Sequence, residues 1–264
     1  FYVPAVILFL NSIPGVRERD FSNLEVLLYG ASPISEDVLL TAKDIFKCKF
    51  IQVYGLTETC GAGTILEPED HDPSLGRLRS CGKVAPTAEL KIVDSKGNSL
   101  GPNEVGEITY RSKSVMKGYW KNEEATKKSI SSGWFSTGDA GYLDADGYLY
   151  IHDRIKDMIV SGGENVYPAE VENALFDHPA IGDVAVIGVP DDKWGEAVKA
   201  VVVLKPGAEA TEDEIISYSR TKIAGYKIPK SIDFTDVLPR NPTGKLLKRE
   251  LRKPYWQGKD RQIN

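Results

Sequence analysis

The stretch LEVLLYGASPISEDVLLTAKDIFKCKFIQVYGLTE, residues 24 to 58, determines how the first part of the chain folds. Residues 24–30 form a continuous apolar run that ends at glycine, which predicts a strand buried on both faces. Ser35 is suited to cap a helix, because acidic residues follow it and apolar residues then recur at helical spacing through Phe46. Residues 50–55 predict a second strand, so the three elements form a parallel βαβ unit.

The ends of these two strands are where a ligand is expected, because ligands of parallel sheets gather outside the carboxyl ends of strands. Those ends are Gly30-Ala31-Ser32 and YGLTE, residues 54–58. A tyrosine can stack on a flat base, a threonine hydroxyl can donate to phosphate, and a glutamate can hold a hard cation such as Mg²⁺. Alternatively, YGLTE is an ordinary loop with a satisfied hydroxyl and a solvated carboxylate.

The pattern changes near residue 76 to short alternating strands such as AELKIVD and GEITYRS, and Asp146-Gly147 predicts a hairpin. Beyond residue 154 helices and strands mix again; a capping box at Thr211 and Glu214 predicts a helix through about Ala224, and LLKREL a last short helix. We therefore expect α/β plus α+β: residues 1–75 as the end of an α/β sheet subdomain, 76–153 as a small antiparallel β-barrel, and 154–264 as an α+β C-terminal domain.

The composition is that of an ordinary, mildly acidic globular protein. The 264 residues carry a net charge of -5, and 41% of them are hydrophobic. This balance argues against binding of nucleic acid, which needs clustered lysine and arginine. Cys48, Cys60 and Cys81 lie far apart without metal-ligand spacing, so we expect no disulfide framework or zinc site, and a cytoplasmic location.

The first ten residues, FYVPAVILFL, are the longest apolar run. The run contains Pro4 and falls far short of the ~20 residues that a membrane span requires. It also lacks the basic region and cleavage site of a signal peptide. We expect no transmembrane segment, and peripheral association with a membrane is left open. Because Phe1 stands in mid-pattern, we expect the N-terminal part of a longer protein to be missing.

The segment PRNPTGKLLKREL, residues 239 to 251, places a Gly-Lys pair before a helix, as a phosphate-binding P-loop does. The spacing excludes that motif. Pro239 stands where the motif needs glycine, and Leu246 stands where it needs serine or threonine. Lys245 therefore needs another explanation.

Two further segments carry residues suited to a nucleotide. In STGD, residues 136–139, Asp139 can accept hydrogen bonds from both hydroxyls of a ribose. The alternative is an Asx-turn, in which the carboxylate satisfies backbone amides. In DRIKDMIVSGGENVYP, residues 153–168, two glycines permit close approach of the backbone to a ligand, and we expect them and Asn165 to open a helix. The alternative is a domain linker and a glycine turn with solvated Arg154 and Lys156.

Six motifs stand in a characteristic order: LLYGASP, YGLTE, STGD, DRIKD with SGGENVYPAEVE, PDDKWGEAVKAVVV and PRNPTGK. In these motifs the chain resembles the adenylate-forming superfamily of acyl-CoA synthetases, luciferases and peptide-synthetase adenylation domains. The resemblance covers residues 24 to 251, and it is strongest to fatty-acyl and aryl CoA ligases. In such enzymes a carboxylate attacks the α-phosphate of ATP to give an acyl-adenylate and pyrophosphate, and CoA thiolate then displaces AMP to give a thioester.

The resemblance implies a role for each matching residue. Gly30, Ala31 and Ser32 border the adenine, Tyr54 stacks on it beside Gly55, Thr57 contacts phosphate, Glu58 holds Mg²⁺, Asp139 binds the ribose, and Arg154 reaches ribose or phosphate. Lys245 matches the catalyst of adenylation, which bonds the carboxylate and α-phosphate oxygens as negative charge builds. ATP, Mg²⁺ and CoA are thus the implied cofactors and co-substrates.

The resemblance also implies a mobile C-terminal domain that rotates about Lys156. One face of that domain, bearing Lys245, serves adenylation, and another, bearing Gly162 and Gly163, serves thioester formation. The two glycines would line a tunnel for the pantetheine arm of CoA. Trp194 and Tyr226 are further candidates for its walls; alternatively, they are buried aromatics that pack the core.

The sequence departs from the family in one respect. The Ser/Thr/Gly-rich phosphate loop of the TSGTTGxPKG kind is absent, so we expect the chain alone to be an inactive ligase whose partner is the missing N-terminal half of the same protein. The small residues 60–63 leave room for a bulky or long acyl group. The prediction is an ATP-dependent acid:CoA ligase for a medium- or long-chain fatty acid. The alternatives are an aryl-CoA ligase, a carrier-protein-loading adenylation enzyme, or a noncatalytic AMP/ATP-binding half-protein.

Overall fold

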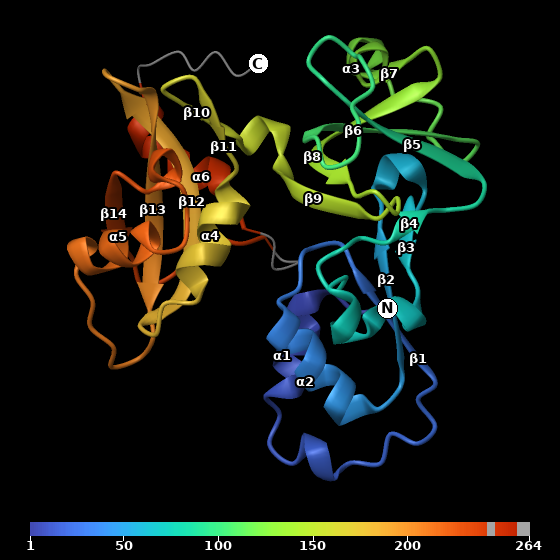
Figure 1. The fold of residues 1–264 in the computed structure, drawn as a ribbon, viewed down its shortest axis with the longest axis horizontal. Coiled ribbons are helices and arrows are strands. Elements are labelled where there is room, and N and C mark those ends of the chain that lie inside the picture. Colours follow the sequence, from blue (N-terminus) through green and yellow to red (C-terminus); the bar gives the residue numbers. More distant parts are fainter. Residues whose placement is uncertain (242–245, 258–264) are drawn as a thin grey trace. The chain divides into compact units, whose positions relative to one another are not determined.

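The predicted βαβ unit forms at the start of the computed structural model, which describes residues 1–241 and 246–257 (Figure 1). Strands β1 (Val26–Gly30) and β2 (Lys49–Tyr54) pair in parallel, and α2 (Glu36–Phe46) joins them. Ser35 caps α2 as expected: its hydroxyl accepts a hydrogen bond from the amide of Val38 at 3.4 Å. The sequence pattern of this unit is therefore confirmed.

The chain divides into two units, Phe1–Ile151 and His152–Asn264. The division falls within strand β9 (Leu149–Arg154). A hinge at Lys156 stays a prediction. Among the described residues of either unit, no helix is long and apolar enough to cross a membrane.

Unit 1 begins with a four-stranded sheet in the order β1-β2-β3-β4, in which β3 (Thr64–Leu66) and β4 (Lys83–Val84) run antiparallel to their neighbours. Helix α1 (Pro4–Asn11) packs beside α2. The apolar side chains of both helices share one core with Leu27, Tyr29 and Phe50 of the sheet. This core fixes the strand ends at which the candidate ligand contacts lie.

The prediction that β1 is buried on both faces is wrong. Leu27 and Tyr29 are buried, but Val26 and Leu28 are each 38% exposed. The physical reason is coverage: the core formed with α1 and α2 contains Leu27 and Tyr29 but neither Val26 nor Leu28.

The second sheet of unit 1 is the expected antiparallel structure, a half-barrel. Its order is β5-β6-β8-β7, and β9 pairs with β8. Its other strands are β5 (Ala88–Val93), β6 (Gly106–Ser112), β7 (Ile130–Ser131) and β8 (Trp134–Leu143), and helix α3 (Glu123–Ser129) precedes β7. Ile92, Ile108 and Leu149 lie in its buried core.

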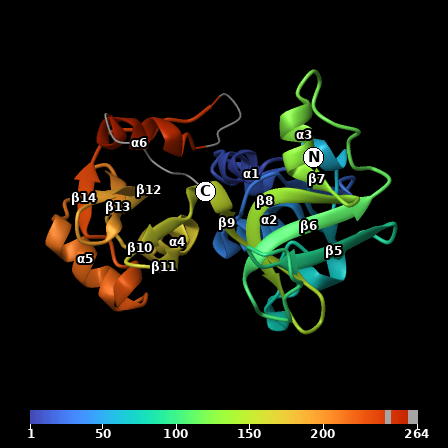
Figure 2. The ribbon, with the colours of Figure 1, turned by 90° about the horizontal axis from the view of Figure 1, so that it is seen from above.

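Unit 2 is an α+β structure around a sheet in the order β11-β10-β13-β12, with β14 parallel to β13. Its strands are β10 (Ile159–Ser161), β11 (Glu164–Val166), β12 (Ile181–Asp191), β13 (Gly195–Leu204) and β14 (Ser231–Phe234), and its helices are α4 (Pro168–Phe176), α5 (Glu212–Arg220) and α6 (Lys248–Trp256). Helices α4 and α5 cover one face of the sheet and α6 the other (Figure 2).

Three element bounds in unit 2 differ from expectation. Gly162 and Gly163 do not open a helix but form the turn of a β10–β11 hairpin, with φ angles of +61° and +88° that suit glycine. Helix α5 ends at Arg220 rather than near Ala224. Helix α6 extends past Pro254 to Trp256, whose indole N–H donates to the carbonyl of Gly188 at 3.0 Å.

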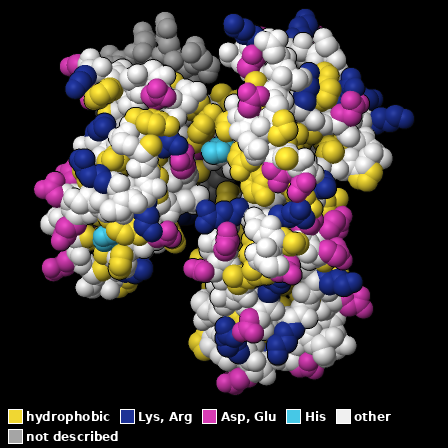
Figure 3. Space-filling model, viewed as in Figure 1, with side chains coloured by type: hydrophobic (Ala, Val, Ile, Leu, Met, Phe, Trp, Pro, Cys, Tyr) yellow, Lys and Arg dark blue, Asp and Glu magenta, His cyan; other side chains and the backbone are white. Residues whose placement is uncertain are grey.

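Short 3₁₀ helices complete the described chain: η1 (Val16–Glu18), η2 (Thr57–Thr59), η3 (Pro68–His71), η4 (Pro73–Leu75), η5 (Ile155–Asp157) and η6 (Gly225–Lys227). On the face seen in Figure 3, acidic and basic side chains intersperse over each unit.

A buried histidine, His71, contacts Tyr29 of strand β1 in the first sheet. His71 Nδ1 lies 2.8 Å from the carbonyl oxygen of Glu67, so this nitrogen carries the proton and donates it. Nε2 lies 3.0 Å from the hydroxyl of Tyr29 and therefore accepts. The imidazole is neutral in this arrangement, and burial lowers the pKa of His71.

The neutral His71 predicts a pH-dependent stability of unit 1. The unfolded chain binds a proton near the ordinary pKa of 6.5, whereas the folded chain binds it only at lower pH, so the free energy of unfolding should fall as pH decreases from 7 to 5. His71→Phe should remove this part of the slope and should lower stability at pH 7 by about 1–3 kcal/mol, because the Tyr29 hydroxyl loses its partner. Urea titrations of both proteins at the two pH values measure the difference. An equal slope in the two proteins would contradict the assignment.

Candidate active site

Two candidate nucleotide residues meet in unit 1. Tyr54 is the last residue of β2 and Asp139 lies in β8, yet the Tyr54 hydroxyl donates to Asp139 Oδ2 at 2.7 Å. Burial, reinforced by the Asp139 carboxylate, raises the pKa of Tyr54, so the phenol remains a donor. Thr137 holds the backbone of Asp139, since its hydroxyl accepts from the Asp139 amide at 3.1 Å and donates to the Ile108 carbonyl at 2.7 Å. The tyrosine ring and the carboxylate are thereby fixed relative to each other.

Glu58 is held by a loop that the sequence did not single out. Tyr119 donates its hydroxyl proton to Glu58 Oε1 at 2.9 Å, and the Met116 amide donates to the Glu58 carbonyl at 2.7 Å. A lone tyrosine has no spacing signal, so only the fold could reveal this contact. Within the described chain no group of three or more acidic, histidine or cysteine side chains could hold a metal. A single carboxylate fits Mg²⁺ that is bound chiefly through nucleotide phosphates.

The glycines of the two strand-end motifs are required by packing. A Cβ on Gly30 would lie 2.1 Å from the Val53 carbonyl oxygen, and one on Gly55 would lie 1.7 Å from that of Gly61. Ala31 has a φ of +70°, which is unfavourable for a residue with a side chain. Ala31, Ser32 and Thr57 are exposed at these strand ends, and their contacts with adenine and phosphate stay predictions.

The small residues after YGLTE are accessible in part. Cys60, Gly61 and Ala62 are exposed, whereas Gly63 is buried and its amide donates to the Tyr54 carbonyl at 2.7 Å. The turn thus folds back onto the end of β2. An acyl group beside these residues stays a prediction.

In unit 2 the glycine hairpin packs against Trp194. The Gly162 amide donates to the Trp194 carbonyl at 2.8 Å, and a Cβ on Gly162 would lie 2.7 Å from the indole ring. A Cβ on Gly163 would meet no atom within 4 Å. Trp194 is 38% exposed and Tyr226 is 42% exposed, so the alternative that they are buried core aromatics is wrong. Both remain available to a ligand.

Two lysines that the sequence did not single out lie over the Trp194 ring. Lys193 Nζ is 4.6 Å and Lys230 Nζ is 5.5 Å from the ring centroid. Lys193 lies in the loop before β13 and Lys230 in the loop before β14. Because they are far apart in the chain, no local sequence motif predicts that they meet. An aromatic ring with two ammonium groups suits a ligand that has both an organic body and phosphates.

The remaining candidates in unit 2 lie around the DRIKD motif and the segment before α6. Arg154, the last residue of β9, is partly buried, and Lys156 is exposed in η5. Lys245 lies outside the described residues. Its described neighbours are fixed: Arg240 and Leu246 form an antiparallel bridge, and the Leu247 amide donates to the Pro239 carbonyl at 2.8 Å.

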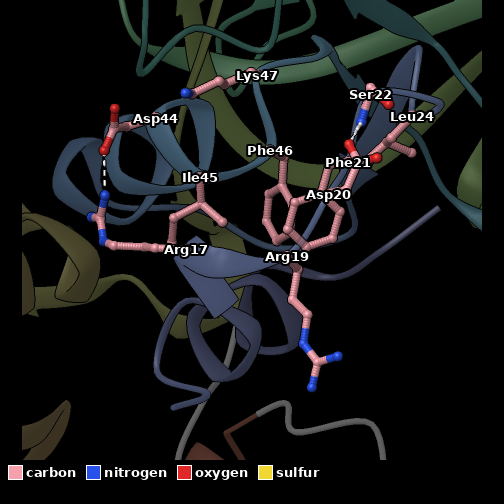
Figure 4. A pocket seen from close by; sticks show the side chains of 10 residues that line it. All are labelled: Arg17, Arg19, Asp20, Phe21, Ser22, Leu24, Asp44, Ile45, Phe46 and Lys47. Carbon is pink, nitrogen blue, oxygen red and sulfur yellow. Dashed lines mark hydrogen bonds and ion pairs between the residues drawn. The ribbon is translucent and has the colours of Figure 1, made fainter. Parts of the chain in front are cut away.

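A pocket of about 390 Å³ in unit 1 contains none of these candidates (Figure 4). It is lined by Arg17, Arg19, Asp20, Phe21, Ser22, Leu24, Asp44, Ile45, Phe46 and Lys47. Arg17 pairs with Asp44 at its rim, and Phe21 packs edge-on against Phe46 at 4.9 Å between ring centroids. The Phe21–Phe46 contact belongs to the core around α2, whereas Arg17 and Asp44 are exposed, and we assign no ligand to the pocket.

Comparisons with known proteins match both units. Residues 1–120 match the family described as AMP-binding enzyme, and residues 170–245 match the AMP-binding enzyme C-terminal domain. A fatty acid–[acyl-carrier-protein] ligase, ScoC of Streptomyces coeruleorubidus, is 41% identical over 99% of the chain and 50% of its own length. The chain belongs to the adenylate-forming superfamily. A second relative of this superfamily, the long-chain-fatty-acid–CoA ligase FadD13 of Mycobacterium tuberculosis, is 42% identical over 96% of the chain and 49% of its own length.

A solved structure of the superfamily has the same fold. The o-succinylbenzoate CoA synthetase of Bacillus subtilis, in complex with its acyl-adenylate intermediate, superposes with a TM-score of 0.82 at 37% identity, over 95% of this chain and 50% of that chain. The expected fold class is confirmed. The chain spans about half the length of the curated relatives it matches, and those relatives are acid–thiol ligases.

The contact between Gly55 and Gly61 predicts a steric effect at the turn that carries Glu58. Gly55→Ala should lower the free energy of unfolding by about 1–3 kcal/mol, because its methyl group would overlap the backbone of the same turn. Gly63→Ala is the matched control in that turn, since its methyl group would find only ordinary contact at 3.4 Å from the Tyr110 ring. Urea denaturation of the two variants measures the difference. Equal stabilities would contradict the close approach.

Proposed function

We propose that this chain is the C-terminal part of an ATP-dependent acid–thiol ligase that forms an acyl-adenylate and then a thioester. The observation that carries the proposal is the 2.7 Å hydrogen bond between Tyr54 and Asp139. It joins two distant motifs, YGLTE and STGD, at the end of a parallel strand, where nucleotides bind in α/β sheets. A base-stacking ring and a ribose-binding carboxylate are thus held side by side.

In the first step a carboxylate oxygen of the acid attacks the α-phosphorus of ATP. A bond forms between these atoms, the bond from the α-phosphorus to the bridging oxygen breaks, and pyrophosphate leaves. Tyr54 and Asp139 orient the nucleoside, and Glu58, held by Tyr119, would bind the Mg²⁺ that neutralises phosphate charge. Arg154 reaches the ribose or phosphate, and Lys245 stabilises the charge that develops on the reacting oxygens.

In the second step a thiolate attacks the acyl carbon, and AMP leaves. The Gly162-Gly163 turn lets a narrow pantetheine arm approach the backbone, and Trp194 and Tyr226 form apolar walls beside it. Lys193 and Lys230 lie over Trp194 and suit the phosphates at the far end of CoA. These cations favour CoA as the thiol; the pantetheine of a carrier protein, which ScoC's name indicates for that relative, is the second candidate.

For the acid we propose a medium- or long-chain fatty acid. The two relatives named above are ligases of fatty acids by name. The exposed small residues Cys60, Gly61 and Ala62 leave space for a long apolar group beside the nucleotide motif. An aryl acid is the alternative, because the similar o-succinylbenzoate synthetase uses an aromatic acid by name.

The proposed adenylation predicts that Lys245 and Asp139 act at different stages. In the full gene product, Lys245→Ala should lower the kcat of acid-dependent pyrophosphate release at least a hundredfold, or about 3 kcal/mol, because it removes charge stabilisation in the transition state. Asp139→Asn should instead raise the KM for ATP, since it weakens ribose binding. Calorimetry with AMP on the 264-residue chain separates nucleotide binding from catalysis. Undiminished adenylation by Lys245→Ala, or AMP binding without any pyrophosphate release by the gene product, would reject the assignment.

The glycine hairpin predicts a variant that slows only the second step. Gly163→Leu should slow thioester formation at least about tenfold while acyl-adenylate formation stays within about twofold, because the side chain would occupy the path of the thiol arm. Gly163→Ala is the matched control, because it has the same backbone strain but little bulk. Rapid-quench measurement of each half-reaction gives the two rates. An equal loss of both rates in Gly163→Leu would reject the tunnel.

A further inference from the structure

A shallow hollow of about 360 Å³ in unit 1 combines a tryptophan with several lysines. It is lined by Lys117, Gly118, Tyr119, Trp120, Lys121, Glu123, Thr126 and Lys127. Trp120 is 88% exposed, compared with 38% for Trp194. Because hydration of so large an apolar ring is unfavourable, a tryptophan held in water points to a partner that covers it.

The turn that carries Trp120 has a fixed structure. The Asn122 amide donates to the Tyr119 carbonyl at 3.2 Å and closes the turn around Trp120 and Lys121. The Tyr119 amide donates to the hydroxyl of Thr126, in helix α3, at 2.9 Å. The turn is thus attached to α3, and the exposure of Trp120 is a property of a defined loop.

The segment around the hollow is basic, although the chain as a whole is acidic. Five exposed lysines against two glutamates give residues 113–128 a net charge of +3, whereas the chain carries -5. Figure 3 shows lysine and arginine side chains projecting at the end of unit 1 that carries α3. Lys121 Nζ lies 5.8 Å from the centroid of the Trp120 ring. We call Trp120 and the five lysines the Trp120 surface; the lysines are Lys113, Lys117, Lys121, Lys127 and Lys128.

The composition of the hollow favours a lipid surface over a protein as the anionic partner. A protein interface buries a core of several apolar side chains, but only Trp120 and Tyr119 among the lining residues have large rings. At a bilayer surface a tryptophan lies among the head groups, and lysines beside it are attracted by anionic lipids. Helix α1 contrasts with this surface: its exposed Val6, Leu8 and Phe9 stand in a helix without charged residues, which suits burial against protein.

We propose that the Trp120 surface docks this protein on an anionic membrane. The docking is peripheral, since no helix of the described residues is long and apolar enough to cross a bilayer. The inference deepens the proposed function and rests on it for the substrate: a long-chain fatty acid partitions into bilayers, so the docked protein takes its acid from the lipid. Tyr119, the neighbour of Trp120, donates to Glu58 at 2.9 Å, so the docking surface adjoins the candidate cation site.

Co-sedimentation of the full gene product with vesicles tests the docking. Vesicles of phosphatidylcholine and phosphatidylserine should bind the protein at least about tenfold more tightly than vesicles of phosphatidylcholine alone. Trp120→Ala should weaken binding to the mixed vesicles at least about tenfold, and Lys121→Ser about fivefold.

Two variants serve as matched controls for the vesicle measurement. Lys96→Ser removes an exposed lysine from a turn elsewhere in unit 1, and Trp194→Ala removes an exposed tryptophan that has lysines beside it in unit 2. Both should bind the mixed vesicles within about twofold of the unaltered protein, because neither belongs to the Trp120 surface. Unchanged vesicle binding by Trp120→Ala would overturn the inference, and so would binding to polyglutamate or single-stranded DNA as tight as to vesicles and equally insensitive to Trp120.

Adenylation assays distinguish failure of the inference from failure of the proposed function. With a medium-chain acid free in solution, Trp120→Ala should form acyl-adenylate within about twofold of the unaltered rate, since Trp120 does not contact the reactants. With a long-chain acid held in the mixed vesicles, the same variant should be at least about fivefold slower. Equal rates in the second assay would reject delivery from the lipid. Absence of any adenylation by the unaltered protein would reject the proposed function, whereas docking stands or falls with the vesicle measurement.

Discussion

The parallel pairing of β1 with β2 is the constraint on which the candidate nucleotide site depends. In this register Gly30 lies opposite Val53, so the segments 31–32 and 54–58 leave the sheet at the same edge. Gly30 has no side chain because the Val53 carbonyl occupies that space, and Gly55 has none because the Gly61 carbonyl does. The motif glycines are thus explained by backbone packing, and the proposed ligand contacts lie at the edge that this packing creates.

Much of this arrangement could be predicted from the sequence because its signals are local. The Ser35 cap, the apolar face of α2 and the Asp146-Gly147 hairpin each depend on neighbours in the chain, and each formed as expected. The Tyr54–Asp139 contact joins residues 85 positions apart, so the two motifs could be named but their meeting could not be derived. Tyr119 beside Glu58 was missed for the same reason.

The wrong predictions came from sequence patterns that are compatible with two different local structures. A continuous apolar strand predicts two buried faces. Val26 and Leu28 are nevertheless exposed, because neither helix of the described core covers them. Two adjacent glycines suit the start of a helix as well as a hairpin turn. The positive φ angles of Gly162 and Gly163 show that they form the turn. The β10–β11 pairing that follows needs only three residues on each side, which is too short for periodicity to register.

The two units hold their candidate residues in opposite ways, and this difference bears on how such a protein works. In unit 1, Asp139 is 5% exposed and accepts a hydrogen bond from Tyr54, so these two candidate nucleotide residues have little freedom. In unit 2, Lys156, Trp194 and Tyr226 are exposed, while the groups buried beneath the motif are the ion pairs of Asp153 and Asp157. A rigid site can orient a substrate by itself, because its geometry is set before binding. The exposed side chains of unit 2 stand on a backbone that the buried ion pairs of Asp153 and Asp157 hold against helix α6.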